Sequence, residues 1–184
     1  MHASCRAMPA NGSIDSMSGP TDAASFGGVA QTENKRKFLV VVDKSPEAKV
    51  ALRFATRRAQ HTGGRVSLLC VAQPADFQQW RGVEEIMRDE AHQEAESLIF
   101  AAAKTVNELS GILPELIILH GRSKDCLIEV LKGDRDISIL VLATSTSKEG
   151  PGPLVSMFAS AGAHPIPVTI VPGALSDEEV DALA

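Results

Sequence analysis

The sequence predicts a doubly wound α/β fold, in which helices cover both faces of one parallel β-sheet. Short runs of β-branched and aliphatic residues, typical of strands buried on both faces, alternate with longer segments whose apolar residues recur every three or four positions. Such alternation favours parallel strands joined by right-handed crossovers. The chain has 184 residues, of which 44% are hydrophobic, and this length suits one domain with a sizeable core rather than two.

The first predicted strand is the run FLVVV at residues 38–42, and it ends at Asp43. Ser45 then has the hydroxyl that a helix N-cap needs, and Pro46 suits the first helical position. We expect the helix that follows to end at Gly63, because glycine is preferred just beyond a helix C-terminus.

A second buried strand is predicted at residues 65–72, followed by a long helix from about residue 83 to residue 110. Apolar residues recur along this helix at spacings of three and four, and this stripe predicts the face that lies on the sheet. The stripe comprises Val83, Met87, Ala91, Ala95, Leu98, Ala102, Val106 and Leu109. Two further strands, at residues 115–120 and 137–143, are separated by a short helix at residues 125–132.

A polar loop with two glycines and a proline, TSTSKEGPG at residues 144–152, follows the fourth strand. We expect it to lead into a helix at residues 153–163 and a final strand at residues 167–171. The acidic tail, residues 174–184, predicts a terminal turn of helix with Ser176 as its cap.

Residues 1–36 differ from the rest, being rich in Ser, Gly, Ala and Pro and without hydrophobic periodicity. They lack the apolar core of roughly 7–15 residues that a secretory signal needs. We expect a disordered leader; the alternative is that translation starts at Met8 or Met17. The predicted domain then covers residues 37–173.

Composition narrows the function classes. A net charge of −5 argues against a nucleic-acid binder, and no apolar run approaches the roughly 20 residues that span a bilayer. The three cysteines, Cys5, Cys70 and Cys126, show no C-x-x-C spacing, and the last two fall in apolar segments. Reduced thiols of this kind suit a cytoplasmic protein.

No recognisable catalytic or metal motif is present, so we expect a binding protein rather than an enzyme. Neither Ser156 nor Ser160 lies in a G-x-S-x-G motif, and no two histidines have the sequence spacing of a pair of metal ligands. The histidines of the predicted domain are His61, His92, His120 and His164.

In an open parallel sheet, ligands bind beyond the carboxyl ends of the strands, where the strand order reverses. The loop after the first strand runs from Asp43 to Pro46, and the loop after the fourth strand covers residues 144–152. If these two strands are neighbours, the two loops face each other across a crevice.

The run VVVD followed by SPEAKVALRFA, then Gly121 before a helix, ISILVLA and a closing PVTIV, resembles the universal stress protein family in order and spacing. The resemblance covers residues 37–173. It implies a five-stranded parallel sheet ordered 3-2-1-4-5 and a homodimer paired through the fifth strand. We expect that dimer edge to comprise Val168, Thr169, Ile170 and Val171, because prolines at 165 and 167 shorten the strand.

Some members of that family bind ATP, with Mg²⁺, through a glycine-rich motif after the fourth strand. Here Ala143 and Thr146 stand at the first two glycine positions, and Ser156 stands where the later glycine would be. A Cβ at these places keeps phosphates from approaching the backbone closely. Hydroxyls between residues 144 and 147, with Lys148 beside them, can still bind an anion.

By the same resemblance, Asp43 lies near the adenosine and Val71 near the adenine; the plainer alternatives are a loop-capping acid and an interior valine. The residues expected at the ligand site are Asp43, Ser45, Val71, Ala143, Thr144, Ser145, Thr146, Ser147, Lys148 and Ser156.

Three functions stay open at this stage. The first is a universal stress-type regulatory protein that acts through a ligand or partner in the crevice. The second is an ATP-binding protein with slow hydrolysis or self-phosphorylation on the TSTS segment. The third is a pure interaction module, in which the 144–152 loop and the acidic tail dock a protein partner.

Overall fold

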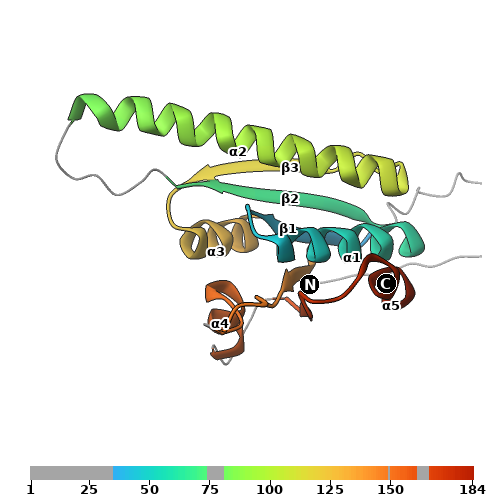
Figure 1. Cartoon of the computed structure of the whole chain (residues 1–184). Helices are drawn as coiled ribbons and strands as arrows, with labels where there is room; N and C mark the ends of the chain where they lie inside the picture. The colour runs from blue at the N-terminus through green and yellow to red at the C-terminus, as the bar shows by residue number, and fades with distance from the viewer. Residues whose placement is uncertain (1–34, 74–80, 149, 161–165) are drawn as a thin grey trace, which may run out of the picture. The chain divides into compact units, whose positions relative to one another are not determined.

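The computed structural model describes residues 35–73, 81–148, 150–160 and 166–184. Its centre is a five-stranded sheet in which every paired strand is parallel and the order is β3-β2-β1-β4-β5 (Figure 1). This confirms the predicted fold class and the predicted contact between the first and fourth strands. The strands are β1 (Lys37–Val42), β2 (Arg65–Ala72), β3 (Glu115–His120), β4 (Ile137–Ala143) and β5 (Val168–Val171).

Helices cover both faces of the sheet, because alternate residues of each strand point to opposite sides. From β1, Phe38 and Val40 join the core under α1 and α2, whereas Leu39 joins the core under α3 and α4. All three side chains are at most 2% exposed. The helices are α1 (Pro46–Thr62), α2 (Arg81–Ser110), α3 (Ser123–Gly133), α4 (Pro153–Ser160) and α5 (Asp177–Leu183).

The predicted caps explain where α1 begins and ends. The Ser45 hydroxyl accepts a hydrogen bond from the Ala48 N–H at 3.2 Å, and Pro46 is the first helical residue. Gly63 ends the helix in the left-handed conformation, with φ of 63°. These local signals place the first turn of α1 next to the end of β1.

The acidic tail forms α5, and Ser176 caps it as predicted. The Ser176 hydroxyl accepts from the Glu179 N–H, while the Glu179 carboxylate accepts from the Ser176 N–H, which together make a capping box. Two arginines of α1, Arg53 and Arg57, bind Asp181 of this helix. The tail is therefore part of the packed unit rather than an appendage.

Some boundaries differ from the sequence-based expectation. Helix α2 begins at Arg81, about two residues early, and its fully buried face includes Ile99, which the predicted stripe omitted. Strand β5 begins at Val168 rather than Pro167, although the Pro167 carbonyl still accepts from the Leu140 N–H. Residues 161–163 of the predicted last helix, and nearly all of the predicted leader, lie outside the described residues.

Candidate functional site

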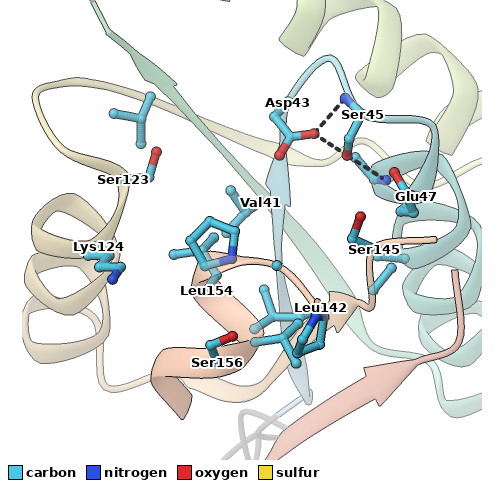
Figure 2. Close-up of a pocket in the computed structure, with 18 of the residues that line it drawn as sticks. Val41, Asp43, Ser45, Glu47, Ser123, Lys124, Leu142, Ser145, Leu154 and Ser156 are labelled. Atoms are coloured by element: carbon cyan, nitrogen blue, oxygen red, sulfur yellow. Dashed lines mark hydrogen bonds between the residues drawn. The ribbon is translucent and has the colours of Figure 1, made fainter. Parts of the chain in front are cut away.

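A pocket of about 800 Å³ opens at the carboxyl ends of β1 and β4 (Figure 2). Its walls come from the end of β1 and the start of α1, from the segment between β4 and α4, and from the start of α3. These two strands are neighbours at the point where the strand order changes direction. The two loops expected to face each other therefore line one pocket.

Apolar side chains form the inner wall of the pocket. Val41 and Val71 come from β1 and β2, Leu142 comes from β4, and Val155 comes from α4. Leu142 and Val155 are buried, whereas Val41 and Val71 are partly exposed toward the pocket. Such a wall suits the flat, weakly polar face of an organic ring, with the polar rim left to orient it.

Asp43 lies at the rim, on the first residue after β1. Its Oδ1 accepts from the Ser45 N–H at 2.8 Å and from the Ser45 hydroxyl (Figure 2). The carboxylate thus closes the turn that leads into α1, as a strand-end aspartate often does. Asp43 remains exposed and lines the pocket, so closing the turn and contacting a ligand are compatible.

Glu47, in the first turn of α1, is a pocket residue that sequence reasoning missed. Its side chain reaches across to the segment after β4, where Oε1 accepts from both the N–H and the hydroxyl of Thr146, each at 2.7 Å. Hydrogen bonds from Thr146 lower the pKa of this carboxyl group, so it stays ionised at neutral pH. The only sequence signal is an acidic residue near a helix N-terminus beside the predicted crevice.

The backbone of the segment after β4 is also engaged by the chain itself. The Thr144 N–H donates to the Val171 carbonyl at 2.9 Å and the Ser145 N–H to the Pro151 carbonyl at 3.1 Å. The Ser147 N–H donates to the Ser145 hydroxyl at 3.1 Å. Together with the bond from Thr146, every N–H group from residue 144 to residue 147 has an internal acceptor.

Sequence and structure comparisons identify the fold family. The family model described as "Universal stress protein family" matches residues 35–172. The chain belongs to this family. None of the curated proteins matches the chain in sequence.

Solved universal stress proteins share its fold. UspA from Lactobacillus plantarum is 19% identical, with a TM-score of 0.63 over 74% of this chain and 97% of that one. The Archaeoglobus fulgidus protein in complex with dAMP is 19% identical, with a TM-score of 0.50 over 74% and 97%. The Arabidopsis thaliana protein with AMP bound is 17% identical, with a TM-score of 0.52 over 78% and 95%.

In this universal stress protein, the pocket collects most of the residues predicted for the ligand site. Thr144, Thr146 and Lys148 are not among the described residues that line it. Ser145 and Ser147 line the pocket, whereas Thr144 and Thr146, their neighbours in the chain, do not. Whether the lining residues bind a ligand stays a prediction. The predicted residues that do line it are Asp43, Ser45, Val71, Ala143, Ser145, Ser147 and Ser156.

The Thr144 and Thr146 hydroxyls have structural partners instead. The Thr144 hydroxyl accepts from the Gly173 N–H at 3.2 Å, and the Thr146 hydroxyl donates to Glu47. Lys148 is exposed. Three of the five polar side chains predicted between residues 144 and 148 therefore do not face the pocket.

The start of α3 forms an opposite wall that sequence reasoning also missed. Arg122, Ser123 and Lys124 line the pocket there, and Ser123 accepts from the Gln73 side-chain amide. Ser123 and Lys124 lie across the pocket from Glu47 in Figure 2. The wall next to α1 thus carries the carboxylates, and the wall at α3 carries the cations.

Metal-ligating and reactive side chains are sparse in the part of the chain that the structure describes. No group of three or more His, Cys, Asp or Glu side chains is arranged to hold a metal ion there. Cys70 and Cys126 are buried free thiols, and burial raises the pKa of both. Among the described helices, none is both long enough and apolar enough to cross a membrane.

Proposed function

We propose that this universal stress protein is a regulatory protein that acts by binding an adenine nucleoside or nucleotide in the pocket between β1 and β4. The observation that carries the proposal is the pocket itself, which lies where the strand order reverses. Its volume of about 800 Å³ falls in the range of small-molecule sites. The Archaeoglobus fulgidus and Arabidopsis thaliana relatives, described as holding dAMP and AMP, support the choice of ligand class.

The wall chemistry fits the two ends of an adenosine. The apolar side chains of Val41 and Val71 offer a surface for the base. Asp43 is an acceptor at the rim, and a carboxylate oxygen suits the hydroxyl donors of a ribose. Because Oδ1 of Asp43 already receives the two Ser45 bonds, we assign the ribose contact to Oδ2.

Calorimetric titration of the full chain with adenosine and AMP tests this function. We expect Asp43→Asn to weaken adenosine binding about tenfold, because a hydrogen bond to a charged acceptor contributes more than one to a neutral acceptor. Asp136→Asn is the matched control, since Asp136 lies just before β4, at the opposite end of the sheet, and is exposed. If the Asp43→Asn variant binds adenosine as tightly as the wild type does, the proposed ribose contact is wrong. If the wild type binds neither adenosine nor AMP, the proposed function is wrong.

The fifth strand supports a proposal about assembly. Strand β5 is an outer strand of the sheet, with no further strand beside it among the described residues, and its residue Ile170 is 41% exposed, so this edge can pair with a second copy. We therefore propose a homodimer joined through residues 168–171.

Sedimentation at micromolar concentration tests the dimer. Ile170→Asp should shift the wild-type dimer to monomer, because it places a charge in the paired edge. Leu116→Asp is the control, since Leu116 lies on the opposite outer strand, β3, and is similarly exposed at 37%. A wild-type monomer, or a dimer that only Leu116→Asp dissociates, would contradict pairing through β5.

A further inference from the structure

The segment after β4 already holds an anion, and that anion is the carboxylate of Glu47. Both bonds from Thr146 end on a single oxygen, Oε1, at 2.7 Å. An N–H group and a hydroxyl converging on one oxygen at these distances is an arrangement that proteins also use to hold phosphate oxygens. Glu47 lines the pocket, so the occupied position is part of its wall.

Packing fixes this carboxylate in place. The Glu47 residue is 7% exposed. Behind it, the turn after β5 comes so close that a Cβ on Gly173 would lie 2.5 Å from the Glu47 Cγ and 2.1 Å from the Thr144 carbonyl oxygen. The side chain is therefore enclosed by α1, by the segment after β4 and by the turn after β5. A ligand phosphate would have to displace a packed side chain in order to reach the Thr146 N–H.

No other N–H group of residues 144–147 is available as a substitute. Those of Thr144, Ser145 and Ser147 donate to the Val171 carbonyl, the Pro151 carbonyl and the Ser145 hydroxyl. Phosphate cradles depend on several backbone N–H groups that point at the ligand. Within residues 144–147 the backbone has such groups, but each of them already donates to an internal acceptor.

Charge acts in the same direction. Asp43 and Glu47 lie on the wall beside α1, whereas Arg122 and Lys124 lie at the start of α3, on the opposite wall. A phosphate that lies beside α1 is repelled by the two carboxylates, because like charges a few ångströms apart in a partly enclosed site repel appreciably. Among the described residues that line the pocket, only the wall at the start of α3 offers cations to a phosphate. A nucleoside carries no phosphate charge, and a monophosphate carries the least of the nucleotides.

We infer that Glu47 is a specificity-determining residue, whose carboxylate occupies the anion position of the pocket and restricts the ligand to adenosine derivatives with at most one phosphate. This inference rests on the proposed function, because it concerns the same pocket. On this inference, the contact of Glu47 with Thr146, and not only the missing glycines, disfavours the binding of a nucleoside triphosphate.

The test is calorimetric titration of the full chain with adenosine, AMP and ATP, the last with Mg²⁺. We expect the wild type to bind adenosine and AMP at least about tenfold more tightly than ATP, a difference of about 1.4 kcal/mol. Glu47→Gln keeps an oxygen that accepts from Thr146 but removes the charge, so it should bring the AMP-to-ATP ratio below about threefold. Glu47→Asp keeps the charge and should keep the preference for AMP.

The outcomes separate the two proposals. If the wild type binds ATP as tightly as AMP, the role of Glu47 is wrong while the adenosine pocket stands. The same holds if a Glu47→Gln variant with the wild-type melting temperature leaves the ratio unchanged. If none of the three ligands binds the wild type, the proposed function fails, and the inference fails with it. A wild-type preference for AMP over ATP below about tenfold overturns the role of Glu47 even if the Gln variant does not fold, and a loss of the preference in Glu47→Asp, which keeps the charge, overturns it as well.

Discussion

Glu47, Thr146 and Gly173 show how one residue can depend on segments far away in the chain. Glu47 and Thr146 are separated by 99 residues, and Gly173, from a third segment, packs directly against Glu47. A glycine is needed at position 173 for space rather than for backbone conformation, because any Cβ there would overlap the Thr144 carbonyl oxygen at 2.1 Å. The hydrogen bonds to Glu47 therefore rely on a residue that touches no ligand.

We predict that Gly173→Ala lowers the free energy of unfolding by about 1–3 kcal/mol, the usual cost of overpacking. The backbone oxygen of Thr144 cannot move aside without shifting the segment that carries Thr146. Urea denaturation at neutral pH measures the effect. Gly133→Ala is the control, since a Cβ at Gly133 meets nothing within 4 Å and should leave stability unchanged or slightly raised. An unchanged midpoint for the Gly173 variant would show that the turn relaxes freely.

Sequence reasoning predicted the local parts of the site and missed the long-range ones. The Asp43–Ser45 turn and the cap of α1 are encoded within four residues, so the pattern alone was enough. The contact of Glu47 with Thr146 joins two segments that are distant in the sequence, and no local sequence pattern predicts it.

At the scale of elements, buried strands were the easiest to predict. The β-branched run of β1 and the apolar run of β4 were located to within one residue, because strands covered on both faces leave a continuous apolar signature. The start of the long helix α2 was predicted about two residues late, because no Ser, Thr, Asp or Asn directly precedes its first residue in the sequence. The buried residue Ile99 was missed because the predicted stripe ran through the adjacent residue Leu98 instead.

The sequence pattern predicted helix α5 itself but not the contacts that this helix makes. The Ser176 cap was predictable from sequence, but the attachment of the helix to α1 was not. Arg53 and Arg57 are four residues apart on α1, and Asp177 and Asp181 are four residues apart on α5, so both pairs lie on single helix faces. Which faces would meet depends on the turn after β5, and only the structure shows that the two pairs come together.

For the whole molecule, the position of the pocket followed from topology, whereas its charge distribution did not. Adjacent parallel strands whose connections diverge leave a crevice at their carboxyl ends. The residues that follow β1 and β4 therefore had to lie close together. The cations of α3 were not predicted, because α3 follows β3, which is two strands away from β1. The full strand order came from the family resemblance rather than from the residues.

Carboxylates with lowered pKa values are spread over the molecule, and they link its stability to pH. Arg53 and Arg57 hold the pKa of Asp181 well below its usual range, and Lys37 lowers the pKa of Glu115 at the amino end of the sheet. A group whose pKa is lower in the folded state stabilises the protein above its unfolded pKa and loses that contribution as pH falls. The free energy of unfolding should therefore decrease from about pH 4 downward, since unfolded Asp and Glu titrate near pH 4.

Asp181→Asn isolates the contribution of α5 to this acid sensitivity. At pH 7 we expect the variant to lose about 1 kcal/mol, because Asp181 is 32% exposed and its ion pairs are partly screened by water. Below about pH 4 the difference from the wild type should begin to shrink, since Asp181 of the unfolded chain is protonated there while the folded-state carboxylate keeps its charge to a lower pH. Asp177→Asn is the control: that side chain also binds Arg53 but is 71% exposed, so its effect should be smaller at every pH. Urea denaturation from pH 3 to pH 7 measures both, and parallel pH curves for wild type and Asp181→Asn would show that Asp181 contributes nothing to acid unfolding.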